Sequence, residues 1–217
     1  MNFARAKLKE TAALYANQLL EHARRREPLI TEDLQKIALE VSAEIIGLEY
    51  RFKSEESLTR KITEKTEEIL ENLSIKLSVE SRIIEKYVSR IAELNNDTLR
   101  YTFILPLEIY FFSFKKTLSA LKDSGYDTKR IWNAWRNVET RYDAGYRGVN
   151  ATIISSQSQK FEIQFHTKES FQLKTKTHHL YKMAVSRKTS AERRAQFIRT
   201  MIDAAKDISI PKGAAKL

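Results

Sequence analysis

Two carboxylates in this chain, Asp97 and Glu162, stand where predicted strands would position them for chemistry. Asp97 lies just before an aromatic and β-branched run over residues 99–105, which is typical of a strand. Alternation over residues 160–167 gives one face three polar side chains, Glu162, Gln164 and His166. If the two strands are neighbours, the carboxylates repel each other unless a cation such as Mg²⁺ lies between them, and Glu162 could activate an attacking hydroxyl. The alternative is an ordinary loop aspartate beside a solvated polar face.

A candidate phosphate site lies in residues 47–61, which we expect to run from a short strand into a helix. Its polar and cationic groups are Arg51, Lys53, Ser54, Ser57 and Lys61. A helix N-terminus presents free backbone N–H groups, and cations beside it strengthen the attraction for a polyphosphate. No glycine-rich turn precedes Lys61, so the segment is not a Walker A loop. A capped helix with surface lysines would have the same sequence features.

A loop with two glycines, residues 142–150, carries Tyr146 between flexible neighbours. An aromatic ring displayed in this way can stack on a nucleobase, a contact worth about 1–3 kcal/mol per base. A tyrosine packed over a turn is the structural alternative.

These residues depend on a scaffold in which strands and helices alternate along the chain. Apolar spacings of three to four predict helices over residues 3–25, 31–45, 54–73, 78–94, 107–121, 169–185 and 191–207. β-Branched and aromatic runs predict strands over residues 47–53, 99–105, 131–135, 148–155 and 160–167. Pro28 is expected to separate the first two helices, and Ser54 to cap the third. Residues 209–217 are expected to form a loose tail.

The composition restricts the chemistry that is possible. The chain has 217 residues, a formal net charge of +10 and no cysteine, which excludes disulfides, thiolate metal sites and a catalytic thiol. The positive charge is concentrated in residues 115–216, where it attracts polyanions such as nucleotides or nucleic acid, or simply maintains solubility. The first 18 residues mix charged with apolar side chains, so we expect neither a signal segment nor a membrane span there, and a soluble protein that acts in the cytoplasm.

In this order and spacing, the four segments resemble the synthetase domain of the RelA/SpoT family, and more closely its toxin-like branch of interbacterial effectors and phage-associated proteins. The resemblance covers residues 44–182, because His178 also matches the histidine of the helix that follows the second catalytic carboxylate. It implies an α+β fold in which a mixed β-sheet of about five strands is flanked by helices, as in nucleotidyltransferases. We therefore expect a helical extension over residues 1–46, a synthetase domain over residues 47–208 and the tail.

The resemblance also implies a role for each candidate residue. Asp97 and Glu162 would be the catalytic carboxylates that hold Mg²⁺. The residues implied to hold ATP are Arg51 on the adenine and Lys53, Ser54, Ser57 and Lys61 on the phosphates. The residues implied to hold the acceptor are Tyr146 on its base, with Asn150, Gln164, His166 and His178. Ordinary alarmone synthetases have a histidine where Asn150 stands and an arginine where His166 stands, so the acceptor half is altered whereas the donor half is intact.

The implied reaction is transfer of the β,γ-pyrophosphoryl group of ATP to the 3′-hydroxyl of an acceptor, with release of AMP. The expected acceptor is a purine nucleotide, giving (p)ppApp or (p)ppGpp, and the alternative is the terminal adenosine of tRNA. The toxin-like branch further implies growth inhibition, an immunity or antitoxin partner, and delivery into a target cell as part of a larger secreted protein. A non-catalytic RNA-binding module on the same scaffold is a different class of hypothesis. For an ADP-ribosylating toxin, the glutamate-rich signature loop is missing from the sequence.

Overall fold

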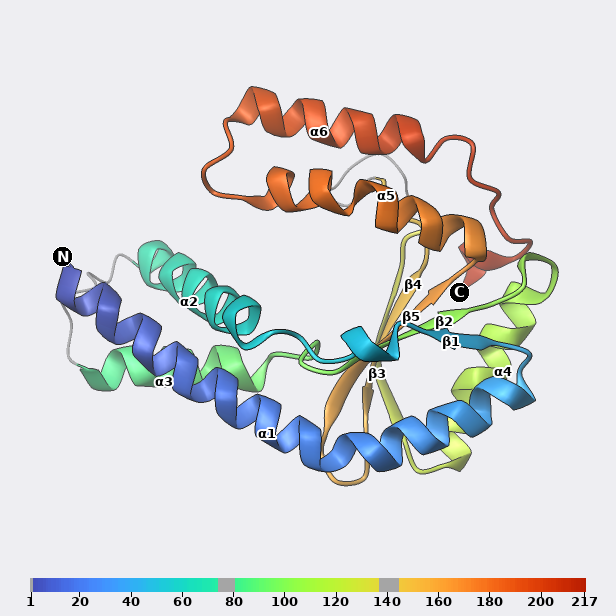
Figure 1. Cartoon of the computed structure of the whole chain (residues 1–217), viewed down its shortest axis with the longest axis horizontal. Helices are drawn as coiled ribbons and strands as arrows, with labels where there is room; N and C mark the ends of the chain where they lie inside the picture. The colour runs from blue at the N-terminus through green and yellow to red at the C-terminus, as the bar shows by residue number, and fades with distance from the viewer. Residues whose placement is uncertain (1, 74–80, 137–144) are drawn as a thin grey trace.

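A five-stranded mixed sheet forms the centre of the molecule (Figure 1), in a computed structural model that describes residues 2–73, 81–136 and 145–217. The strands are β1 (Glu44–Ile46), β2 (Arg100–Ile104), β3 (Asp127–Asn133), β4 (Val149–Ile154) and β5 (Lys160–His166). Their order in the sheet is β1-β2-β5-β4-β3. The pair β2 and β5 is parallel, and the other three pairs are antiparallel. The predicted α+β class and the mixed sheet of about five strands are therefore confirmed.

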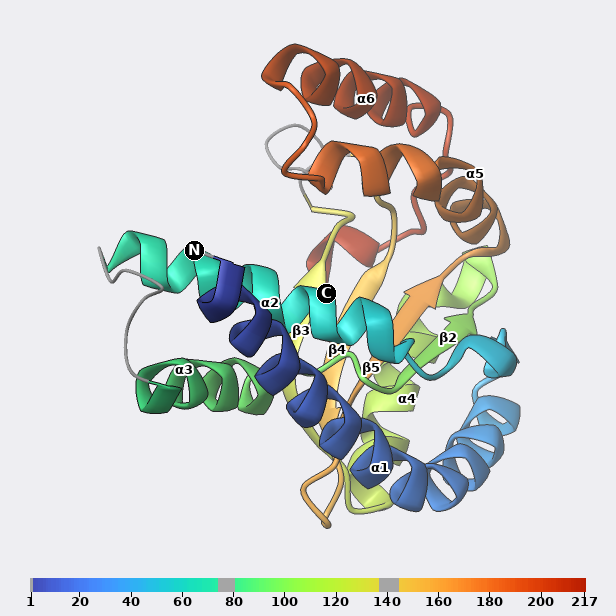
Figure 2. The ribbon, with the colours of Figure 1, turned by 60° about the vertical axis from the view of Figure 1, so that its left-hand side comes forward.

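The two faces of the sheet carry different helices, because the strands alternate between apolar and polar side chains. The apolar face packs against the second half of α1 (Asn2–Glu40) and against α4 (Tyr110–Asp123), with Leu34, Phe103 and Phe114 in the shared core. On the polar side lie α5 (Lys168–Val185) and α6 (Ala191–Ala204), and α6 packs against α5 (Figure 2). The polar side of the sheet therefore faces the α5–α6 pair.

A second core lies beside the sheet, where the first half of α1 packs against α2 (Glu55–Asn72) and α3 (Ser81–Glu93). Small residues on α1, including Ala12 and Ala16, are fully buried there and allow the helices to approach closely. This three-helix cluster holds the N-terminus of α2 at one end of the polar face. Among the described helices, none combines the length with the apolar composition that crossing a membrane requires.

Three predictions about local structure are wrong. Residues 3–25 and 31–45 do not form two helices, because α1 continues through Pro28. Proline removes a backbone hydrogen bond at that point, but Ala23 and Ile30 on either side are buried in one core, and this packing keeps the helix continuous. Residues 44–46, which we placed in a helical extension, form strand β1 instead. Residues 47–53 form the 3₁₀ turn η1 (Leu48–Tyr50) and an isolated bridge between Phe52 and Leu99 rather than a regular strand.

The C-terminal residues are not a loose tail. They include the 3₁₀ turn η3 (Ala214–Lys216), and the side chain of Ala214 is fully buried. Asn133 Nδ2 donates hydrogen bonds to the carbonyls of Ala214 and Leu217, at 2.8 and 3.1 Å. A small apolar residue and two satisfied carbonyls thus anchor a segment whose composition alone predicts disorder. The tail contacts the strand that ends the sheet, so it braces β3.

Candidate active site

The polar face of the sheet forms the floor of a cavity of about 300 Å³, which we call the carboxylate cavity because both Asp97 and Glu162 line it. Register places Arg100 of β2 beside Glu162 of β5, and Gln164 of β5 beside Asn150 of β4. The opposite wall comes from α5 and α6. The remaining lining residues are Trp132, Gly145, Tyr146, Lys174, Thr177, His178, Tyr181 and Met201. The structure therefore brings together candidate residues that are far apart in the sequence.

Asp97 lies in the segment before β2, and two lysines hold it. Lys53 Nζ and Lys61 Nζ each donate to one of its carboxylate oxygens at 2.6 Å. The segment is fixed on one side by the hydrogen bond from Asn96 Nδ2 to Thr152 Oγ1 of β4, at 2.6 Å. Burial raises the pKa of Asp97, but the ammonium groups of Lys61 and Lys53 outweigh that effect and hold the pKa well below its ordinary value. Asp97 is therefore a fixed negative charge.

Glu162 lies in the middle of β5 and has a different environment. Gln164 Nε2 donates to its carboxylate at 2.6 Å, and no lysine or arginine forms an ion pair with it among the described residues. Burial raises the pKa of Glu162, and the nearby charge of Asp97 raises it further. Two carboxylates whose environments move their pKa values in opposite directions are typical of acid–base sites, in which one holds charge and the other exchanges a proton.

These two carboxylates are the candidate ligands for a metal ion. Among the described residues, no group of three or more histidine, aspartate and glutamate side chains is close enough to hold a metal. Mg²⁺ is commonly bound by one or two carboxylates together with substrate phosphates and water, so Asp97 and Glu162 fit that ion rather than a metal held by protein ligands alone.

The N-terminus of α2 lies next to Asp97, as the predicted phosphate site requires. Ser54 is the N-cap: its Oγ accepts from the backbone N–H of Ser57 at 3.2 Å and donates to Ser57 Oγ at 2.8 Å. The predicted cap is thus confirmed. Lys53 precedes the cap, and Lys61 follows on the first turns of the helix, where their ammonium groups meet at Asp97. Two cations and the first turn of a helix are therefore close to the carboxylate cavity.

Arg51 lies elsewhere. Its Nε donates to Glu27 of α1 at 2.6 Å, and it also donates to the carbonyl of Leu48. Glu27 in turn accepts from Thr31, whose hydroxyl contacts the hydroxyl of Tyr101 at 2.7 Å. Arg51 lines neither the carboxylate cavity nor the cavity beside it. Arg51 therefore pairs with Glu27, whereas Lys53 and Lys61 pair with Asp97 of the carboxylate cavity, and its role toward the adenine stays a prediction.

Tyr146 forms an aromatic wall of the carboxylate cavity. Its ring stacks on Trp132, with centroids 5.3 Å apart and planes at 29°. Its hydroxyl donates to Asn150 Oδ1 at 2.5 Å and contacts His166 Nε2 at 2.9 Å. The predicted aromatic is therefore not displayed on a flexible loop, because Trp132 occupies one face of its ring and the hydroxyl is fixed. Of the predicted loop, residues 142–144 lie outside the described residues.

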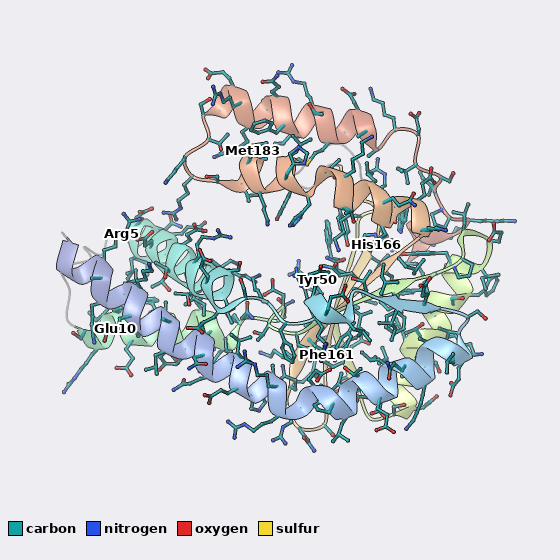
Figure 3. All side chains as sticks on the ribbon, viewed as in Figure 1. Arg5, Glu10, Tyr50, Phe161, His166 and Met183 are labelled. Atoms are coloured by element: carbon teal, nitrogen blue, oxygen red, sulfur yellow. The ribbon has the colours of Figure 1, made fainter. Side chains whose placement is uncertain are left out.

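His166 lies below this wall and is completely buried. Its Nδ1 is 3.0 Å from Ser170 Oγ, in the capping box that begins α5. Burial, with the charge of Lys174 nearby, lowers the pKa of His166 to about 3, so the imidazole is neutral near pH 7. His166 and Phe161, both labelled in Figure 3, lie near opposite ends of β5, and the alternation puts them on opposite faces of the sheet. His166 supports Tyr146 and does not line the cavity itself.

Sequence reasoning missed several residues that line the cleft. Arg100 alternates with buried Tyr101 on β2, so the alternation used for β5 would have placed it on the polar face. Lys174 lies one turn before His178 on α5, and that spacing would have identified it as a neighbour of the predicted histidine. Lys174 Nζ donates to Gln164 Oε1, and burial lowers the pKa of Lys174 to about 8. Trp132 had no signal beyond its place in a predicted strand.

A second cavity of about 250 Å³ adjoins the first, and we call it the Tyr50 cavity. The two cavities share four lining residues, namely Arg100, Gln164, Lys174 and His178. The Tyr50 cavity adds Tyr50 and Gly47 near η1, and Phe171 of α5. The cleft therefore has two compartments with a charged boundary between them.

The comparisons with known proteins find similarity in structure and not in sequence. No protein-family model matches the sequence, and no curated protein matches it. The structure is similar to the crystal structure of the complex between the Type VI effector Tas1 and its immunity protein, with a TM-score of 0.49 and 14% sequence identity. The similarity covers 88% of this chain and 96% of that chain.

Proposed function

We propose that this protein is an ATP-dependent pyrophosphokinase, which transfers the β,γ-pyrophosphoryl group of ATP to the 3′-hydroxyl of a nucleotide acceptor. The observation that carries the proposal is the convergence of Asp97 and Glu162 on one cavity, with a cationic helix N-terminus at one side and an aromatic wall at the other. Phosphoryl transfer requires mainly positioning and charge neutralisation, and these residues can supply both.

The donor phosphates would bind at the N-terminus of α2. Lys53 and Lys61 are the cations there, and Ser54 and Ser57 are the hydroxyl groups. Both lysines donate to Asp97, which holds their ammonium groups in place. A polyphosphate that binds there would contact the same two ammonium groups. Asp97 and Glu162 would hold Mg²⁺ when it is bound, and the ion would neutralise charge on the phosphate oxygens.

Glu162 is the group that would accept the proton of the acceptor. The oxygen of the 3′-hydroxyl forms a bond to the β-phosphorus, the bond between the β-phosphorus and the oxygen of the α-phosphate breaks, and AMP leaves. The proton of the hydroxyl passes to Glu162, whose raised pKa makes it a stronger base than a solvated glutamate. Gln164 fixes one carboxylate oxygen through its amide, so the other oxygen is free to face the hydroxyl.

The acceptor base would lie against the Tyr146 and Trp132 wall. Asn150 and His166 fix the Tyr146 hydroxyl, and His178 lines the same cavity from α5. A volume of about 300 Å³ is at the lower end of the range for small-molecule sites, which favours a mononucleotide over the end of a tRNA. We therefore favour a purine nucleotide as acceptor, giving (p)ppApp or (p)ppGpp. Such a product, together with ATP depletion, would inhibit growth, and an immunity protein is the expected partner.

An acceptor panel tests this proposal. Purified protein is incubated with Mg²⁺ and ATP labelled in the γ-phosphate, and ADP, GDP or tRNA is added separately. Transfer of label to a mononucleotide, with one AMP formed per label transferred, is the expected result. If label appears on tRNA alone, tRNA is the acceptor and the proposed type of reaction still holds. RNA binding that weakens steeply with salt, survives Glu162→Gln and occurs without any transfer would support the non-catalytic module instead.

A further inference from the structure

Tyr50 exposes its ring at the edge of the Tyr50 cavity. The residue, which is labelled in Figure 3, ends η1. Its exposed fraction is 74%. Gly47, at a φ of 66°, begins this turn, and a Cβ there would lie 3.7 Å from Cδ2 of Tyr50. The ring therefore lies beside the glycine of this turn. An aromatic face left open to solvent beside a cavity is suited to contact with another flat ring.

The neighbouring Arg51 is not available in the same way. Its guanidinium donates to Glu27, whose side chain is only 10% exposed. Freeing Arg51 would leave the buried Glu27 carboxylate with the hydroxyl of Thr31 as its one hydrogen-bond partner among the described residues, which is unfavourable. In the arrangement that the structure holds, Tyr50 lines the Tyr50 cavity and Arg51 does not.

The boundary between the two cavities is cationic. Arg100 and Lys174 line both cavities. Lys174 Nζ donates to the neutral amide of Gln164 and lies 5.4 Å from the centroid of the Phe171 ring. Within the described residues, neither cation forms an ion pair with a carboxylate, in contrast to Lys53 and Lys61. These two charges are therefore positioned to face an anionic ligand that spans the boundary.

We propose that the Tyr50 cavity binds the base of the donor nucleotide, with Tyr50 as the stacking platform. Arg100 and Lys174 would face the start of its phosphate chain, and the far end of the chain would lie at the N-terminus of α2. A nucleotide placed in this way would direct its phosphate chain across the boundary toward Asp97 and Glu162. The acceptor base would then occupy the other compartment, against Tyr146. The inference rests on the proposed function, because that function makes the ligand a nucleoside triphosphate.

Binding measurements on the full chain test this inference. The probes are the α,β-methylene analogue of ATP, which cannot release AMP, and inorganic tripolyphosphate, both titrated calorimetrically with Mg²⁺. Loss of a base stack should weaken binding of the analogue by roughly fivefold to 150-fold in Tyr50→Ala and leave tripolyphosphate binding unchanged. Tyr50→Phe retains a ring and should bind as the parent does. Phe112→Ala is the matched control, because Phe112 is 72% exposed but lines neither cavity.

Arg51→Lys separates the two candidate platforms, because it keeps the charge opposite Glu27 but loses the planar guanidinium. Weakening of the analogue in Arg51→Lys but not in Tyr50→Ala would overturn the inference. Equal weakening of both probes in Tyr50→Ala would also overturn it, because tripolyphosphate has no base. Binding that depends on Tyr50 without transfer from ATP would keep the inference and refute the proposed reaction. Transfer that proceeds with no dependence of binding on Tyr50 would refute the inference alone.

Discussion

Replacing Asp97 with asparagine should destabilise the protein measurably in the absence of any ligand. The carboxylate accepts from Lys53 and Lys61 at 2.6 Å each, and the three side chains are between 15% and 29% exposed. Removing one partner of a buried ion pair costs about 3–5 kcal/mol. Partial exposure reduces this cost, and so does the amide oxygen of the new side chain, which can still accept from one lysine. We therefore expect Asp97→Asn to lower the free energy of unfolding by about 2–4 kcal/mol. For a chain of this size the midpoint would fall by roughly 4–16 °C.

The pH dependence of this difference identifies its cause. The pKa of Asp97 is held below its ordinary value of 3.8, so its contribution is complete above that pH and disappears as the pH falls toward the folded-state pKa. Urea unfolding of parent and variant at pH 7 and at steps down to pH 3 should therefore show a gap that narrows in acid. Asp127→Asn is the control, because Asp127 pairs with Lys129 in an exposed position and should change stability by less than about 0.5 kcal/mol. Equal stability of Asp97→Asn and parent at pH 7, or a gap that does not change with pH, would refute this reasoning.

Three further predictions concern the scaffold and the cleft. Gly148→Ala should lower the free energy of unfolding by about 1–3 kcal/mol, since Gly148 has a φ of 156° and a Cβ would lie 2.8 Å from the carbonyl oxygen of Phe165. Thermal unfolding measures the change, and an unchanged midpoint would contradict the prediction. Burial lowers the pKa of Lys174 to about 8, so raising the pH from 7 to 9 should remove its charge and weaken binding of ATP. The Lys174→Met variant should bind ATP equally well at both pH values, which calorimetry at pH 7 and pH 9 measures. The same pH dependence in the variant as in the parent would contradict this prediction. Between pH 8 and the ordinary lysine value of 10.5 the unfolded chain binds more protons, so the same group should make stability rise with pH. Asn133→Ala should lower the free energy of unfolding by about 1–3 kcal/mol, because it removes the amide that donates to the carbonyls of Ala214 and Leu217. Backbone amides of residues 211–217 should then exchange hydrogen faster than in the parent, and unchanged protection would disprove the anchoring.

Alternation was sufficient to predict the floor of the site. It placed Glu162 and Gln164 on the polar face of β5, and it would have placed Arg100 on the polar face of β2 had it been applied there. Capping chemistry likewise identified Ser54, because a serine followed by two glutamates at a helix start is a local signal. These are local rules, and they apply wherever neighbouring residues determine the outcome.

The positions of Arg51, Lys174 and Ala214 could not be predicted from the sequence, because they depend on contacts between distant segments. Arg51 donates to Glu27 because α1 brings that carboxylate next to it, and no local pattern predicts this contact between distant segments. Lys174 faces the sheet because of how α5 lies over the polar face, and helical spacing alone does not say which side faces inward. Ala214 is buried in the core, where Asn133 of β3 donates a hydrogen bond to its carbonyl. Each of these outcomes is set by packing across the chain.

The measurement that tests the central claim most directly is the fate of ATP in parent and Glu162→Gln. Product analysis with a saturating purine nucleotide and Mg²⁺ should show AMP and a pyrophosphorylated acceptor in equal amounts in the parent. In Glu162→Gln the rate should fall by roughly 10²–10⁴-fold, because the amide cannot accept the proton of the hydroxyl. Binding of the non-reactive ATP analogue should weaken far less than the rate falls, because Asp97 and the phosphates would still hold Mg²⁺ in that variant. Formation of ADP and phosphate instead of AMP, or full turnover by Glu162→Gln, would contradict the proposed reaction.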